Sequence, residues 1–448
     1  MNRLASADPH QAVPFVGAFE SVFQPAFDVD NMELTGHDER WASDLELLHL
    51  SGVRQLRYPV RWHRVEARPG TFDWSRTDEV LGWLADHDMA VIADLVHHTS
   101  YPRWLTGFTD RAFRPAYLRF VEAFALRYPH IGGYTLFNEP FTTFQLCGHE
   151  GIWPPHLTGV AGFAAVARAV LPAVAEASRM CRELLPDARH VYVDACERHT
   201  GDGPVGAARA ALANDRRFVV LDAFLGRHLD ERRPFVRALQ AAGADDLFDL
   251  VPGHVDVLGL DYYAHCQWDY SGPSGKGAMH SPRPAPLASL ILEYADRYQL
   301  PVMLAETNVR GYASDRASWL KYTLEQCELA TAAGVDLRGY CWFPFVDSCN
   351  WDSVLRRSEG NIDPVGVYWL DEQLDRRASC MSSAYALAAS GAPVAALPAF
   401  RFREPVADWL RGWAPQMAHW EWQDPPVYET DPPPPAEPIE LRIEDAHG

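Results

Sequence analysis

Two carboxylates stand at the ends of short apolar runs in this sequence. Glu139 closes one run, within Phe-Asn-Glu-Pro, and Glu306 closes another, within Leu-Ala-Glu-Thr-Asn. If both runs are strands of one closed parallel barrel, both carboxyls project from its C-terminal face, where catalytic groups of such barrels lie. Paired carboxyls there suit cleavage of a glycosidic bond, because one can protonate the leaving oxygen while the other attacks or stabilises the anomeric carbon.

The rest of the chain alternates in the way that such a barrel requires. Eight short β-rich runs are predicted as strands: Pro14–Phe19, Val53–Val60, Ala90–His97, Gly133–Phe137, His190–Cys196, Val255–Tyr262, Pro301–Ala305 and Leu337–Phe345. Amphipathic stretches between and after them are predicted as helices: Asp38–Leu50, Thr77–His87, Pro115–Tyr128, Val160–Leu185, Phe218–Ala242, Leu287–Tyr298, Arg316–Ala333 and Arg376–Ala388. Parallel strands need helical crossovers, so the pattern predicts an α/β protein with a single (β/α)8 TIM barrel. An open doubly wound sheet would also alternate, but it would not explain the polar and aromatic residues at so many strand ends.

Segments outside the repeat predict the domain organisation. Residues 1–390 are expected to form the catalytic barrel, and 391–427 a Trp-bearing C-terminal extension that packs on it. Residues 428–448 are Pro-rich and acidic, which predicts a flexible tail. Within the barrel, Cys266–Pro286 is rich in Gly, Ser and Pro and is expected to be a long loop at the functional face.

Composition narrows the classes of partner. A formal net charge of −20 argues against nucleic acid or an anionic membrane surface, both of which need basic contacts. No apolar run approaches the ~20 residues of a membrane helix. The eight cysteines are scattered and the N-terminus lacks an apolar signal core, so we expect a cytoplasmic protein. The expected partner is a small-molecule or oligosaccharide glycoside.

The two carboxylate motifs resemble those of glycoside hydrolase family 1, the retaining β-glycosidases of clan A. The sequence before and after Glu139, Leu-Phe-Asn-Glu-Pro, is similar to the family's Thr-Phe-Asn-Glu-Pro, whose Glu is the general acid/base. Ala-Glu-Thr-Asn around Glu306 is similar to Thr-Glu-Asn-Gly, whose Glu is the nucleophile. The resemblance covers roughly Pro14 to Ala389 and implies double-displacement hydrolysis of O-glycosidic bonds without a cofactor.

Further positions that match the family are implied to bind the substrate. Gln24 resembles the sugar-binding Gln after the first strand, Arg57 an Arg beside the nucleophile, and Tyr263 a Tyr that hydrogen-bonds it. The remaining implied contacts are His98 with the sugar hydroxyls, Asn138 with the 2-hydroxyl, Trp342 and Trp351 with the apolar sugar face, and Asn350 with the outer hydroxyls.

Several positions depart from the family pattern. Asn350 stands where a Glu usually grips the outer hydroxyls, Asp261 stands where Asn is usual, and Trp342 is one place out of register. An Asn at 350 is expected to relax the demand for a free O4 and O6. The reaction class is therefore better defined by the sequence than the sugar.

Alternatives remain at this stage. A β-glucosidase-like exo-glycosidase leads, a clan A endo-glycanase or a transglycosylase on the same carboxylates is second, and a catalytically silent sugar-binding barrel is third. The presence of both Glu residues counts against the third. The adjacent His97 and His98 are expected to point to opposite faces of a strand. Without a His-Glu-x-x-His or carboxylate–His cluster they predict no metal site.

Overall fold

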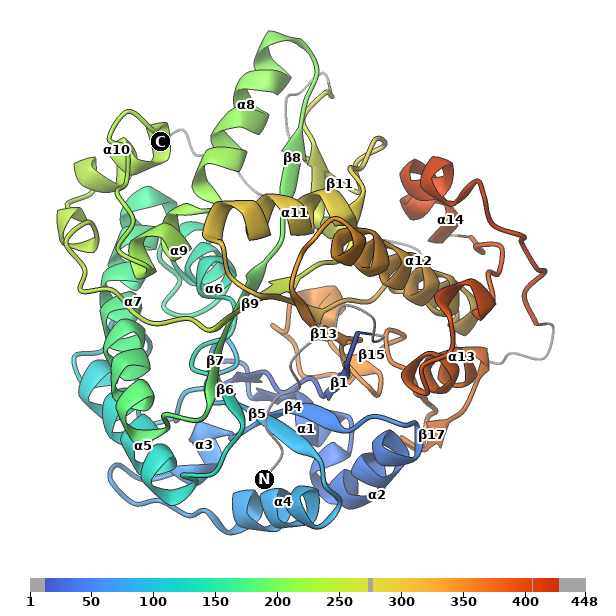
Figure 1. Ribbon diagram of the computed structural model, residues 1–448. Coiled ribbons are helices and arrows are strands. Elements are labelled where there is room, and N and C mark those ends of the chain that lie inside the picture. Colours follow the sequence, from blue (N-terminus) through green and yellow to red (C-terminus); the bar gives the residue numbers. More distant parts are fainter. Residues whose placement is uncertain (1–12, 273–276, 405, 427–448) are drawn as a thin grey trace.

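Eight parallel strands close into a barrel surrounded by helices (Figure 1). The computed structural model describes residues 13–272, 277–404 and 406–426. The barrel strands are β1 (Phe15–Ala18), β4 (Gln55–Pro59), β5 (Ala90–Asp94), β6 (Gly133–Thr135), β7 (Arg189–Ala195), β9 (Val257–Asp261), β12 (Val302–Glu306) and β13 (Leu337–Cys341). β1 pairs in parallel with both β4 and β13, which closes the sheet. The predicted (β/α)8 barrel is confirmed, and each predicted strand contains or overlaps one barrel strand.

Alternate residues of the strands fill the barrel. Val16, Ile92, Val193, Met303 and Cys341 belong to one buried cluster inside it. Because successive strand residues point to opposite faces, their neighbours pack outward against the helices. The interior is thus a solid core, and polar side chains are concentrated at its C-terminal end.

Most of the predicted helices form near their expected bounds. They are α2 (His37–Leu50), α4 (Ser75–Asp86), α5 (Phe113–Arg127), α7 (Gly159–Leu184), α11 (Leu287–Tyr298), α12 (Ala313–Ala332) and α13 (Cys380–Ala389). Among the described helices, α7 alone is long and apolar enough to cross a membrane, and 61% of its most apolar window is buried inside the protein.

One predicted helix is wrong. The stretch 218–242 forms two helices, α9 (Val219–Phe224) and α10 (Pro234–Ala241), after an additional helix α8 (Gly203–Arg216). Gly226 follows α9 with a φ of 65°, a conformation that favours glycine, and Pro234 suits the first turn of a new helix. Local turn chemistry therefore divides an otherwise amphipathic run.

The loop predicted over Cys266–Pro286 contains regular structure. β10 (Gln267–Asp269) pairs with β11 (Ala278–Met279) and with β8 (Arg198–Thr200), which makes a three-stranded sheet outside the barrel. Figure 1 shows β8 and β11 next to α8, beyond the barrel strands. Two distant segments of chain are needed to form this sheet, so composition alone predicts only a loop.

The described part of the C-terminal extension contacts the barrel helices. It contains α14 (Val406–Leu410). Trp413 is fully buried and its Nε1 donates to the hydroxyl of Tyr262 at 3.3 Å. Trp420 Nε1 donates to both carboxylate oxygens of Glu325, at 2.8 and 2.9 Å. The boundary after residue 390 stays a prediction, and the predicted tail at 428–448 lies outside the described residues.

Candidate active site

The two predicted catalytic carboxylates lie at or after the C-terminal ends of two barrel strands. Glu306 is the last residue of β12. Glu139 follows β6 and precedes the short helix α6 (Pro140–Phe144), with a φ of 43°. Its backbone N–H donates to the carbonyl of Val193 at 3.1 Å, and Pro140 suits the first helical position. Both side chains are buried and line the same cavity.

Glu306 is surrounded by groups that favour its ionised form. The hydroxyl of Tyr263 donates to Glu306 Oε2 at 2.6 Å. The buried guanidinium of Arg57 donates to Glu306 Oε1. An adjacent positive charge and a hydrogen-bond donor both stabilise a carboxylate. The arrangement suits a nucleophile, which must be charged to attack.

Glu139 lies in surroundings that favour its protonated form. Burial raises the pKa of this carboxyl well above its ordinary value, and the nearby carboxyls of Asp261 and Asp194 raise it further, against the opposing charge of Arg57. Asp261 is itself fully buried, and burial raises its pKa as well. His98 Nε2 lies 3.4 Å from Glu139 Oε2. A carboxyl that keeps its proton near neutral pH can act as a general acid.

Asn138 connects the two carboxylates through polar contacts. Its side-chain oxygen accepts from Arg57 at 2.9 Å. Its side-chain nitrogen lies 3.5 Å from His97 Nε2 and 3.4 Å from His98 Nε2. The prediction that the two histidines point to opposite faces is therefore wrong. β5 ends before them, at Asp94, and His98 has a φ of 51°, so strand alternation does not apply.

Gln24 lies where a ligand could complete its hydrogen bonds. It ends the short strand β2 (Phe23–Gln24) and is fully buried. Neither its amide oxygen nor its amide nitrogen has a partner among the described residues. An unpaired buried amide costs free energy, so its retention in a buried position indicates a site for a polar ligand.

Phe343, and not the preceding Trp342, lies next to the polar residues of the site. Trp342 is fully buried and donates from Nε1 to the carbonyl of Val365 at 2.8 Å, outside the cavity lining. The ring of Phe343 lies 5.6 Å from the Arg57 guanidinium and 5.8 Å from the His97 ring. Sequence reasoning missed Phe343, although alternation from the inward-facing Cys341 was a usable signal.

Asn350 and its neighbour Trp351 differ in whether they line the cavity. Asn350 is fully buried with a φ of 63°, and its side-chain oxygen accepts from the backbone N–H of Asn361 at 3.1 Å. It is not among the residues that line the cavity, whereas Trp351 is. The substrate contacts predicted for both residues stay predictions.

The cavity next to the carboxylates has a volume of about 160 Å³. Its aromatic lining is Trp153, Trp268, Trp351 and Trp409. Trp409 comes from the C-terminal extension and Trp268 from β10; nothing in their spacing pointed to the site. A cavity of about 250 Å³ lies elsewhere, against α2 and α4, and contains neither catalytic carboxylate. The smaller cavity is the one that matters chemically.

Residues 13–272, 277–404 and 406–426 contain no group of three or more His, Cys, Asp or Glu that could hold a metal ion. The expected independence from metals and cofactors stays a prediction.

Comparisons with known proteins agree with the motifs. Thermostable β-glucosidase B of Thermobispora bispora is 26% identical over 363 residues, 70% of this chain and 73% of that protein. Aryl-phospho-β-D-glucosidase BglC of Bacillus subtilis is 41% identical over 64 residues, 12% of this chain and 13% of that protein. A family 1 β-glucosidase from Thermotoga maritima, solved with isofagomine lactam, matches with a TM-score of 0.71 at 15% identity, over 87% of this chain and 99% of that one.

This chain is similar to the family 1 β-glucosidases. The family 1-like resemblance found in the sequence is thereby confirmed. No family model matches the chain. At 15% identity the structural likeness establishes the barrel fold alone. The evidence for the reaction of this family 1-like barrel is the pair of carboxylates, Glu139 and Glu306.

Proposed function

We propose that this protein is a retaining β-glycosidase, a β-glucosidase-like exo-enzyme that hydrolyses O-glycosidic bonds by double displacement. One observation carries the proposal. A carboxylate held by Arg57 and Tyr263, and a buried carboxyl with a raised pKa, line one cavity at the C-terminal end of the barrel. The similarity to curated β-glucosidases supports the same reaction.

In the first step, Glu306 attacks the anomeric carbon and forms a glycosyl ester. Glu139 gives its proton to the glycosidic oxygen as the bond to the aglycone breaks. Asn138, whose side-chain oxygen accepts from Arg57, hydrogen-bonds the 2-hydroxyl in this proposal, an interaction that strengthens in the oxocarbenium-like transition state.

In the second step, Glu139 is a carboxylate, and it takes a proton from a water molecule as that water attacks the anomeric carbon. The ester bond to Glu306 breaks, and both carboxyls return to their starting forms. Two inversions give net retention. The carboxyl separation predicted for this outcome is roughly 5–5.5 Å.

The same site favours an exo-glycosidase over an endo-glycanase and over a catalytically silent sugar-binding barrel. A cavity of about 160 Å³ favours a small glycoside over a long glycan, which supports an exo-enzyme over an endo-glycanase. A silent sugar-binding barrel has no need for a nucleophile and an acid with separate supporting groups. We also propose a cytoplasmic location, supported by the buried free thiols of Cys147, Cys181, Cys196, Cys266, Cys327, Cys341 and Cys349.

The acid/base role is tested by Glu139→Ala. Turnover of substrates with poor leaving groups is expected to fall most, by about 10²–10⁴-fold, because only these need protonation. Azide is expected to restore part of the turnover of activated aryl glycosides by attacking the glycosyl-enzyme. The measurement is kcat/KM across a series of nitrophenyl and alkyl β-glycosides.

A second carboxylate from the same cavity gives a matched control. Glu197→Ala removes a lining carboxylate that the mechanism does not use, and neither leaving-group dependence nor an azide response is expected. Equal losses on activated and unactivated substrates in Glu139→Ala, or azide rescue in both variants, would contradict the assignment.

A further inference from the structure

Glu20 is a third buried carboxylate next to the catalytic network. It follows β1 by two residues and only 4% of its surface is exposed. Glu20 Oε1 accepts from the backbone N–H groups of Ser21 and Val22, at 2.8 and 2.9 Å. Glu20 Oε2 is buried and accepts no hydrogen bond from any described residue. One oxygen is thus fixed by the backbone while the other is held without a donor.

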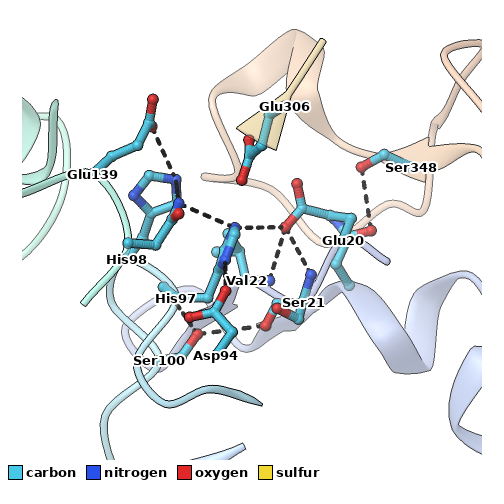
Figure 2. A network of polar contacts seen from close by, with 12 residues as sticks. Glu20, Ser21, Val22, Asp94, His97, His98, Ser100, Glu139, Glu306 and Ser348 are labelled. Atoms are coloured by element: carbon cyan, nitrogen blue, oxygen red, sulfur yellow. Dashed lines mark hydrogen bonds and ion pairs between the residues drawn. The ribbon is translucent and has the colours of Figure 1, made fainter. Parts of the chain in front are cut away.

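A chain of contacts connects Glu20 to the catalytic carboxyls. His97 Nε2 lies 3.6 Å from Glu20 Oε1, and His97 Nδ1 bonds Asp94 Oδ2 at 2.8 Å. His97 Nε2 also lies 3.5 Å from Asn138, which contacts His98 and, through it, Glu139. Figure 2 shows Glu139 and Glu20 at the two ends of this chain of contacts, with His98 and His97 between them.

The unpaired oxygen calls for a donor from outside the protein. A buried carboxylate oxygen without a donor costs free energy, and a hydrogen bond from a bound ligand would offset that cost. Sugar hydroxyls are donors of the required kind. The side-chain amide of Gln24, which follows the same strand, is likewise buried and without a partner among the described residues.

The position where a carboxylate was expected carries none. Asn350 stands there, and its side-chain oxygen is occupied by the backbone of Asn361. The neighbouring Asp352 bonds Arg357 at 3.1 Å and the Asn361 amide at 3.4 Å, and it does not line the cavity. Glu20, on the loop after the first strand, is a buried carboxylate with one oxygen free to accept from a hydroxyl.

We propose that Glu20 is a specificity-determining residue whose free oxygen accepts a hydrogen bond from a hydroxyl on the C3–C4 edge of the sugar. The inference rests on the proposed glycosidase function. With Asn138 at the 2-hydroxyl, the contacts run onward through His97 to Glu20, so the next hydroxyls of the ring meet Glu20. No carboxylate in the described cavity lining is assigned to O6, which should therefore be dispensable.

The test compares Glu20→Gln with the wild type on 4-nitrophenyl β-glucoside and its 3-deoxy, 4-deoxy and 6-deoxy analogues. On the parent substrate, kcat/KM is expected to fall about 10- to 100-fold, the usual range for one charge-assisted hydrogen bond. On the 3-deoxy or the 4-deoxy analogue the loss should shrink below about threefold, because the partner hydroxyl is already missing. The 6-deoxy analogue should lose as much as the parent.

Glu66→Gln is the matched control. Glu66 is a fully buried carboxylate that likewise accepts a backbone N–H, from Gly70 at 2.7 Å, but lies outside the cavity. Its replacement should change all four substrates by the same factor.

Each outcome decides the proposal. Equal losses on all four substrates in Glu20→Gln overturn the role of Glu20 and leave the proposed function standing. A wild type that hydrolyses none of them overturns the proposed function, and with it this inference. If Glu20→Gln does not fold, the wild type decides, because less than a threefold loss on both the 3-deoxy and 4-deoxy analogues would contradict the proposal.

Discussion

The floor and the mouth of the cavity are built in different ways. The residues called the floor are polar and end barrel strands or directly follow them, such as Glu20, Asn138 and Glu306. They form one connected network, which reaches the cavity lining at Glu306. The mouth consists of the rings of Trp268, Trp351 and Trp409 with His280, which come from segments outside the barrel repeat.

The two regions also differ in charge. The floor contains ionisable groups in pairs that shift one another's pKa, as Glu139 and Asp261 do. In the mouth, burial lowers the pKa of His265 to about 4 and of His280 to about 3, so both rings are neutral at neutral pH. The carboxylates of the proposed reaction thus lie in the floor, while the added segments contribute aromatic rings and neutral histidines to the cavity lining.

The floor is tested by Asp261→Asn, the larger of the two expected effects. Glu139 must be protonated to act, so kcat/KM falls as the pH rises through its pKa. Burial and the Asp261 carboxyl both raise that pKa. Removing the Asp261 carboxyl should lower the pKa of Glu139 and move the basic limb of the pH profile to lower pH, so that kcat/KM measured on that limb falls about tenfold.

The control lies at the other end of the same strand. Asp256 immediately precedes β9, whereas Asp261 ends it, so Asp256→Asn removes a carboxylate from the face remote from the cavity. Its profile should keep the wild-type limb. A basic limb that stays in place or moves to higher pH in Asp261→Asn would show that the two carboxyls are not coupled as described.

The mouth is tested by Trp409→Ala, with a smaller effect. Trp409 stacks on His280 with ring centroids 5.8 Å apart and lines the cavity. Its loss should raise KM for aryl β-glycosides about three- to tenfold, in line with one aromatic contact, and leave methyl β-glucoside unchanged. Steady-state kinetics on both substrates measures the difference.

Trp422→Ala is the comparison within the same extension. Its ring packs on Phe402 and Trp420, at 5.7 and 5.1 Å, and lies outside the cavity lining. It should leave both substrates unchanged. If methyl and aryl substrates lose equally in Trp409→Ala, the mouth does not bind the aglycone.

The floor was largely predictable from sequence because its residues are tied to strands. Apolar runs with polar ends indicated Glu306 as a strand-end carboxylate, and the family resemblance implied that Arg57 and Tyr263 lie beside it. The structure joins both residues to Glu306 by hydrogen bonds. The exchange of Trp342 for Phe343 shows the limit of this reasoning, because a register error of one residue reverses the face on which a side chain lies.

The mouth and Glu20 depend on contacts that no local pattern encodes. β8 and β10 pair across 69 positions, as in Arg198 with Gln267, and Trp409 reaches the cavity from the far end of the chain. That Glu20 has an unpartnered oxygen follows only from the packing of its neighbours in space. Such features arise from tertiary structure and not from propensity or periodicity.

The central claim is double displacement at Glu306 and Glu139, and the anomer formed first tests it most directly. The wild type is mixed with an aryl β-glucoside, and the product is followed by proton NMR before mutarotation equilibrates the free sugar. The account predicts that the β-anomer appears first. Initial formation of the α-anomer, the result of a single displacement by water, would contradict it.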